Sequence, residues 1–166
     1  MKFLPTENIT YKTKLKEEEI FGRLSELIEP EKTFRFGIFS SGPTKPYEGR
    51  INSGTFEIKR IISYRNSFLP RISGVIEKNY DGININVKMR LHIFVIVFLC
   101  FWCGGVGLAC IAILTQSFGN SDFNPATLIP FGMLLFAYGL TMGAFKFESN
   151  KSKMDLRRIF EADIIE

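Results

Sequence analysis

The chain has 166 residues, of which 46% are hydrophobic, and a formal net charge of +4 that is unevenly distributed. Residues 1–90 hold 16 Lys or Arg and 11 Asp or Glu, residues 91–145 hold a single charged residue, Asp122, and residues 146–166 hold five bases and five acids. The length excludes two independent cores and suits one domain with a membrane anchor.

The first predicted element is an amphipathic helix over residues 13–29. Its apolar residues recur at helical spacing, and Pro30 is expected to stop it. The acidic run Glu17-Glu18-Glu19 is interpreted as a solvated face of this helix rather than as an acid/base site.

After Pro30 the apolar pattern changes to alternation, which is typical of half-buried strands. Alternating segments occupy 34–38, 56–64, 72–76 and 83–89, and a short strand is expected near 47–51. The turn sequence Asn79-Tyr-Asp-Gly82 predicts that the last two strands form a hairpin. The strands together predict a small antiparallel sheet.

Two apolar segments follow, at about 91–114 and 126–145. At 1.5 Å per residue they would extend roughly 36 and 30 Å, against about 30 Å for the hydrocarbon core of a bilayer. Neither carries the polar stripe that a helix buried in a soluble protein would keep. They are therefore predicted to cross a membrane as a two-helix hairpin, joined by the polar loop 115–125.

The ends of the second span are predicted from its prolines. Asn124 and Pro125 are interpreted as the N-cap and first helical residue. Pro130, one turn further on, predicts a kink because it removes a backbone hydrogen bond.

The distribution of Lys and Arg around the two spans predicts their orientation in the membrane. The loop has none, whereas Lys88 and Arg90 precede the first span and Lys146 follows the second. The positive-inside rule places both termini in the cytoplasm, with the bacterial inner membrane as the expected location. The N-terminal stretch shows no signal-peptide pattern, so the first span is expected to serve as its own insertion signal.

Three cysteines, Cys100, Cys103 and Cys110, lie in the first span. At mid-bilayer a thiolate is strongly disfavoured by desolvation. The Cys-x-x-Cys pair is therefore interpreted as structural rather than as a redox centre, since buried cysteine behaves mostly as a small hydrophobe.

Small residues in both spans are candidates for helix packing. Gly105 and Ala109 form a small-xxx-small pair in the first span, and Gly139 and Gly143 form one in the second. The sequence leaves open whether they pack the hairpin internally or join two copies of the chain.

The last segment predicts a helix that begins at Ser152 and folds back onto the sheet. The predicted fold is thus an α+β membrane protein. Residues 1–90 form a cytoplasmic module of a helix and antiparallel strands, 91–146 form the transmembrane hairpin, and 147–166 form a cytoplasmic amphipathic helix on the sheet.

The sequence contains few motifs that indicate catalysis or ligand binding. The sequence shows no nucleophile elbow, no phosphate loop and no zinc spacing, so no catalytic, cofactor or metal residue is assigned. The one histidine, His92, is interpreted as an interfacial residue beside Arg90. Lys88, Arg90 and Lys146 are predicted to contact lipid head groups.

Further cations could converge on the end of the sheet near the spans, and the sequence offers Lys59, Arg60, Arg65 and Arg71 for this. The modest charge and the lack of a reading motif argue against nucleic acid as a partner.

Two classes of function follow. The first is a non-enzymatic accessory, regulatory or immunity-type membrane protein whose module binds a protein partner, with self-association also open. The alternative is a membrane-bound enzyme or lipid-handling protein with a site at the lipid boundary near His92 and Arg90. A pore-forming oligomer is disfavoured because the spans lack polar residues.

Overall fold

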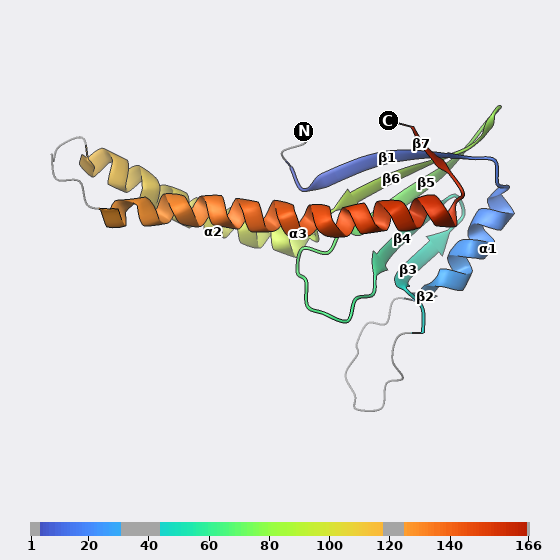
Figure 1. Cartoon of the computed structure of the whole chain (residues 1–166), viewed down its shortest axis with the longest axis horizontal. Helices are drawn as coiled ribbons and strands as arrows, with labels where there is room; N and C mark the ends of the chain where they lie inside the picture. The colour runs from blue at the N-terminus through green and yellow to red at the C-terminus, as the bar shows by residue number, and fades with distance from the viewer. Residues whose placement is uncertain (1–3, 31–43, 118–124, 166) are drawn as a thin grey trace.

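The computed structural model describes residues 4–30, 44–117 and 125–165. These residues form an α+β fold in which a mixed sheet carries helices on one face (Figure 1). The elements in chain order are β1 (Thr6–Thr13), α1 (Glu17–Leu27), β2 (Ile28–Pro30), β3 (Tyr47–Asn52), β4 (Thr55–Arg60), β5 (Arg71–Asn79), β6 (Gly82–Arg90), α2 (Ile93–Ser117), the 3-10 turn η1 (Pro125–Leu128), α3 (Ile129–Ile159) and β7 (Asp163–Ile165).

The seven strands lie in the order β2-β3-β4-β5-β6-β1-β7. The predicted β5–β6 hairpin is confirmed, with Asn79 opposite Gly82, whose φ of +132° suits glycine. The sheet is not purely antiparallel as predicted, because β2 pairs in parallel with β3. Pairing of β7 with β1 joins the two ends of the described chain.

The N-terminal prediction was wrong in part. A strand, β1, occupies residues that the sequence pattern did not assign, and the helix is shorter than predicted because β1 extends to Thr13. Helix α1 starts after Lys16, whose backbone N–H donates to the Glu19 carboxylate over 2.8 Å. The strand predicted over 34–38 lies outside the described residues.

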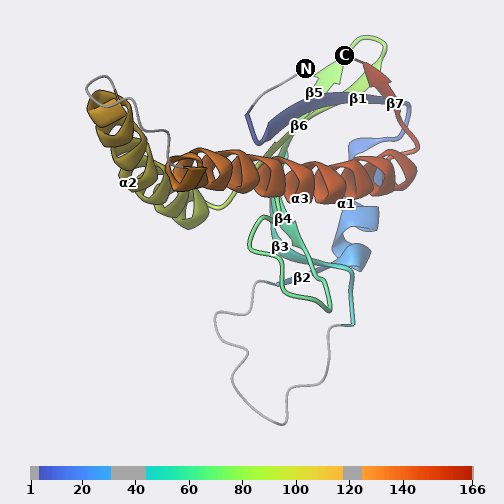
Figure 2. The ribbon, with the colours of Figure 1, turned by 60° about the vertical axis from the view of Figure 1, so that its left-hand side comes forward.

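One face of the sheet carries the core. Helix α1 and the second half of α3 lie across this face (Figures 1 and 2). The Phe160 ring lies 5.9 Å from the Tyr11 ring and 6.0 Å from the Phe56 ring, and all three side chains are fully buried or nearly so. These aromatic contacts join the end of α3 to both halves of the sheet.

Helix α3 is continuous from Ile129 to Ile159, so the separate helix start predicted at Ser152 is wrong. Pro130 lies in its first turn, where a missing N–H costs nothing, so the predicted kink is also wrong. Asn124 lies outside the described residues, and Pro125 begins η1. The residues of α3 that face the sheet follow a helical spacing, namely Phe145, Glu148, Ser149, Ser152 and Leu156.

Helix α2 and the first half of α3 project together from one end of the sheet, which we name the helix end (Figures 1 and 2). Both helices are long and apolar enough to cross a membrane, with mean hydropathy of 2.5 and 1.7 over 18-residue windows. Only 6% and 11% of these windows are buried. Only Leu91 and His92 separate β6 from α2, as the sequence predicted.

Replacing either of two glycines by alanine should change the free energy of unfolding, in opposite directions. A methyl group on Gly74 would lie 2.1 Å from the Phe56 ring, which packs over this glycine from the neighbouring strand. Gly74→Ala should therefore lower the free energy of unfolding by about 1–3 kcal/mol. Gly22, exposed in α1, has nothing within 4 Å of an added Cβ. Gly22→Ala should raise it by about 0.5–1 kcal/mol.

Chemical denaturation of the purified full-length variants measures both effects. Equal changes in the two variants would contradict the packing of Phe56 against Gly74.

Candidate functional site

The sheet face opposite α1 and α3, which we name the open face, is covered by no described element except the first turn of α2. Alternation along five strands directs polar side chains to it. Its residues are Asn8, Thr10, Lys12, Glu48, Arg50, Asn52, Thr55, Glu57, Lys59, Arg71, Ser73, Val75, Glu77, Asn84, Asn86, Lys88 and Arg90. Six cations against three acids make this face basic.

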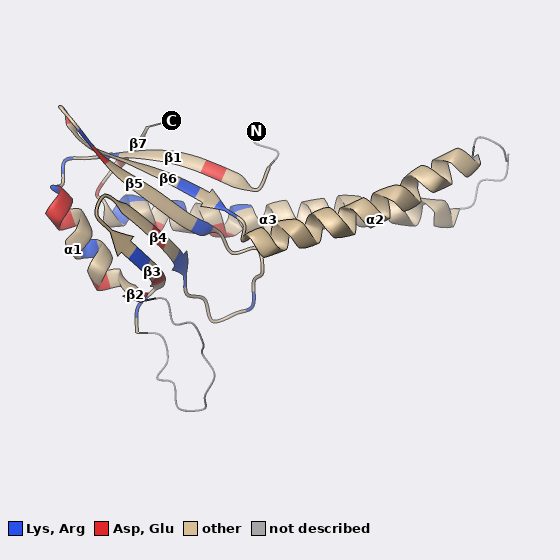
Figure 3. Ribbon diagram, turned by 180° about the vertical axis from the view of Figure 1, so that it is seen from behind, with Lys and Arg blue, Asp and Glu red and all other residues tan. Residues whose placement is uncertain are grey.

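A groove of about 340 Å³ lies at the helix end of the open face. We name it the basic groove. Its charged residues are Glu48, Arg50, Glu57, Lys59, Arg71 and Arg90, and Leu91, Ile93 and Ile96 form an apolar wall. Four neighbouring strands each contribute one cation to it. Figure 3 shows the blue basic positions near this end and the tan, uncharged α2 beyond it.

Strand register sets the order of charges in the groove. Lys59 is opposite Arg71, and Arg71 is opposite Arg90, so three cations form a row across β4, β5 and β6. The Lys59 ammonium lies 3.0 Å from the Glu48 carboxylate, which offsets charge at one end of the row. Like charges directly opposite one another destabilise a sheet. The row is therefore a feature that packing alone does not explain.

A second hollow of about 290 Å³, which we name the central depression, lies further along the open face. Four uncharged polar, three apolar and two charged residues line it. The Thr10 hydroxyl donates to Asn86 Oδ1 over 2.9 Å, and Asn86 Nδ2 donates to the Glu77 carboxylate over 3.0 Å. The side chains here are thus held in place by their neighbours.

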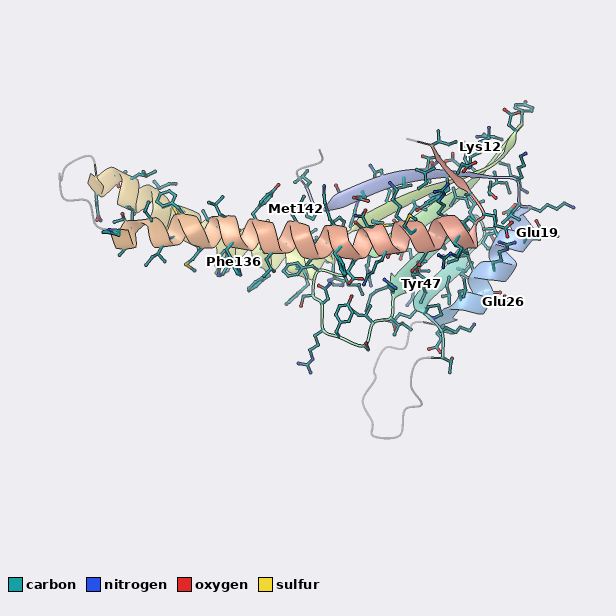
Figure 4. All side chains as sticks on the ribbon, viewed as in Figure 1. Lys12, Glu19, Glu26, Tyr47, Phe136 and Met142 are labelled. Carbon is teal, nitrogen blue, oxygen red and sulfur yellow. The ribbon has the colours of Figure 1, made fainter. Side chains whose placement is uncertain are left out.

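The covered face has a polar cluster beneath α3, which we name the polar seam. Glu148 is fully buried and lies 3.6 Å from Arg60, which also lies 3.6 Å from Asp155. The Tyr64 hydroxyl donates to Glu148, and the Tyr47 hydroxyl, beneath α3 in Figure 4, lies 3.4 Å from Asp155. These contacts fix α3 to β3, β4 and the following loop.

The tyrosines of the covered face are held protonated. Burial raises the pKa of the Tyr11 and Tyr47 hydroxyls well above their usual range. The hydrogen bond to Glu148 raises the pKa of Tyr64. Tyr11 donates to the Lys153 carbonyl over 3.0 Å, so it too anchors α3. The seam is a set of structural contacts between a helix and a sheet.

The sequence-predicted site residues fall in three places. Arg90 lines the basic groove, while Lys88 lies in the central depression. Lys146 is on α3, across the sheet from both. His92 Nδ1 accepts a hydrogen bond from the Phe94 N–H over 3.2 Å, so its side chain caps α2.

The other cations named from the sequence divide between the two faces. Lys59 and Arg71 converge with Arg90, whereas Arg60 lies in the polar seam and Arg65 lies exposed in the β4–β5 loop. Sequence reasoning missed Arg50, although the alternation of β3 places it on the same face as Glu48.

The predicted packing residues are exposed in the monomer. An added Cβ at Gly105, Gly139 or Gly143 would meet no atom within 4 Å, and Ala109 is exposed. They therefore do not form the contact between α2 and α3. Packing through them stays a prediction that needs a second copy. Cys100 is exposed, Cys103 half-buried and Cys110 buried, and all three are free thiols.

Comparison with protein families, with curated proteins and with solved structures gives no match for this chain.

The contacts of the polar seam predict that substitutions of Arg60 and Glu148 change stability non-additively. Arg60→Ala should lower the free energy of unfolding by about 3 kcal/mol, because it leaves the Glu148 carboxylate buried without its cation. Adding Glu148→Gln should recover part of this loss. The control is Arg157→Gln, which removes an exposed pair with Asp163 and should change stability by less than about 0.5 kcal/mol.

Denaturation of the purified full-length variants provides the measurement. Additive losses in the double variant would contradict a direct Arg60–Glu148 interaction.

Proposed function

We propose that this is a two-span membrane protein whose sheet module lies in the cytoplasm and binds a protein partner there. The single observation that carries the membrane assignment is the exposure of α2. Only 6% of an apolar 18-residue window of this helix is buried. A helix apolar on all sides and left uncovered in water would form a large aggregation-prone surface, whereas hydrocarbon would cover it at no cost.

The lengths of the elements agree with a bilayer. Helix α2, with 25 residues, would extend about 37 Å, enough to cross a hydrocarbon core of about 30 Å with its ends among the head groups. The side chains that it exposes are large and apolar, among them Phe94, Phe98, Phe101 and Leu108. On α3, Phe136 points outward from the helix (Figure 4).

The orientation is part of the proposal. Cations cluster at the helix end of the sheet, and the segment between the spans carries none. The positive-inside rule then favours a cytoplasmic module, and with it both termini, at the bacterial inner membrane.

The partner surface that we propose is the central depression and its surroundings on the open face. This face is held in a fixed position relative to the spans, because β6 leads into α2 through two residues and α3 continues from its span onto the sheet. Its excess of cations favours a partner with an acidic surface. The capping hydrogen bond of the His92 imidazole gives this side chain a structural role.

The alternative, a lipid-handling protein, is favoured by a different observation, the basic groove beside Leu91 and Ile93. Its position next to the start of a span is that of a lipid head-group site.

A photo-crosslinking amino acid at Asn86, on the open face, tests the partner surface in cells. We expect one discrete adduct, identified by mass spectrometry as an acidic cytoplasmic protein. The adduct should weaken with Lys88→Glu, which reverses a charge beside Asn86. The matched control is the same crosslinker at Glu26, exposed on α1.

Binding of the purified partner to the full-length protein, and its loss with Lys88→Glu, completes the test. Equal adducts at Asn86 and Glu26, or an adduct insensitive to Lys88→Glu, would overturn the open face as the docking surface.

A further inference from the structure

The basic groove combines two kinds of surface that a soluble anion would not require together. Its floor carries the cation row Lys59, Arg71 and Arg90, and its wall is the apolar junction between β6 and α2. The wall leads directly onto α2, where Ile93 is 67% exposed. A ligand that fills the groove would meet positive charge at one end and an apolar helix at the other.

The row has the composition of a phosphate site. Arginine guanidinium groups bind phosphate oxygens through paired N–H donors. Arg90 makes no ion pair or side-chain hydrogen bond with any residue that the structure describes, so its donors are available. An anion between Arg71 and Arg90 would also offset the repulsion of these directly opposed cations.

The position of the groove matches the phosphate level of a bilayer. Helix α2 is longer than the hydrocarbon core by roughly 7 Å, so its first turn would lie among the head groups. Arg90 is only three residues before the helix start. Basic pockets beside transmembrane helices on the cytoplasmic side are typical sites for anionic lipid head groups.

We propose that the basic groove binds the phosphodiester head group of an anionic phospholipid. The phosphate lies between Arg71 and Arg90, with Lys59 beside it, and an acyl chain extends along α2 past Ile93 and Ile96. The inference depends on the membrane-anchor part of the proposed function and is independent of the protein partner. It differs from simple surface attraction because one lipid occupies a built groove.

The test measures binding of short-chain phosphatidylglycerol and short-chain phosphatidylcholine to the purified full-length protein in neutral detergent, by native mass spectrometry. We expect phosphatidylglycerol to bind at least about tenfold more tightly. The double variant Arg71→Gln/Arg90→Gln should reduce this preference to within about twofold. The matched control Arg65→Gln/Arg158→Gln removes two exposed arginines outside the groove and should keep the preference.

The single variant Arg90→Gln distinguishes loss of lipid binding from misfolding. Arg90 is exposed, and its replacement breaks no ion pair among the described residues. It should lose most of the preference while eluting as the parent protein does. Glycerol 3-phosphate and inorganic phosphate should fail to displace the lipid, since they lack the part that contacts α2.

Three results would overturn the proposal: equal binding of the two lipids, a preference retained in both groove variants, or displacement by glycerol 3-phosphate at comparable concentration. Each would defeat the lipid site alone if the protein still requires detergent to remain dispersed. A chain that stays monodisperse without detergent would instead defeat the membrane anchor, and with it both proposals.

Discussion

Helix α3 is one continuous helix whose two halves have different surroundings. Its first half exposes large apolar side chains, and its second half buries Phe145, Glu148 and Leu156 against the sheet. Because a continuous helix resists bending, the direction in which its first half projects is set by the contacts of its second half. Phe160 at the end of α3 and Arg60 beneath its second half provide those contacts. The direction of the apolar helices relative to the sheet is therefore set by contacts within the fold.

The two faces of the sheet differ in how their charged residues are arranged. The covered face uses apolar packing and the polar seam to hold α1 and α3, so its charges are matched within the fold. The open face gathers cations in register where β4, β5 and β6 approach α2, with Glu48 and Glu57 among them. An arrangement of like charges that costs stability is tolerated most readily where a ligand compensates for it. This contrast is why we assign binding to the open face and structural roles to the seam.

The sequence predicted the features that depend on local patterns. The apolar helices follow from composition, and the β5–β6 hairpin follows from alternation and the turn at Asn79. Strand β1 was missed because most of TENITYKT is polar and its core positions are only Ile9, Tyr11 and Thr13. The continuity of α3 was missed because Glu148 and Ser152 resemble surface residues, yet both are buried. The buried carboxylate is explained by Arg60 and Tyr64, which are distant in sequence. The basic groove could not be predicted because it depends on strand order and register, which align Lys59 with Arg71 and Arg71 with Arg90.

The central claim is that α2 lies in hydrocarbon, and Trp102, the single tryptophan of the chain, lies near the middle of this helix. Its fluorescence in reconstituted vesicles measures the depth directly, with no substitution. The account predicts blue-shifted emission that is quenched most strongly by lipids brominated deep in their acyl chains and is insensitive to aqueous iodide. Red-shifted emission that iodide quenches, with no effect of the brominated lipids, would contradict it.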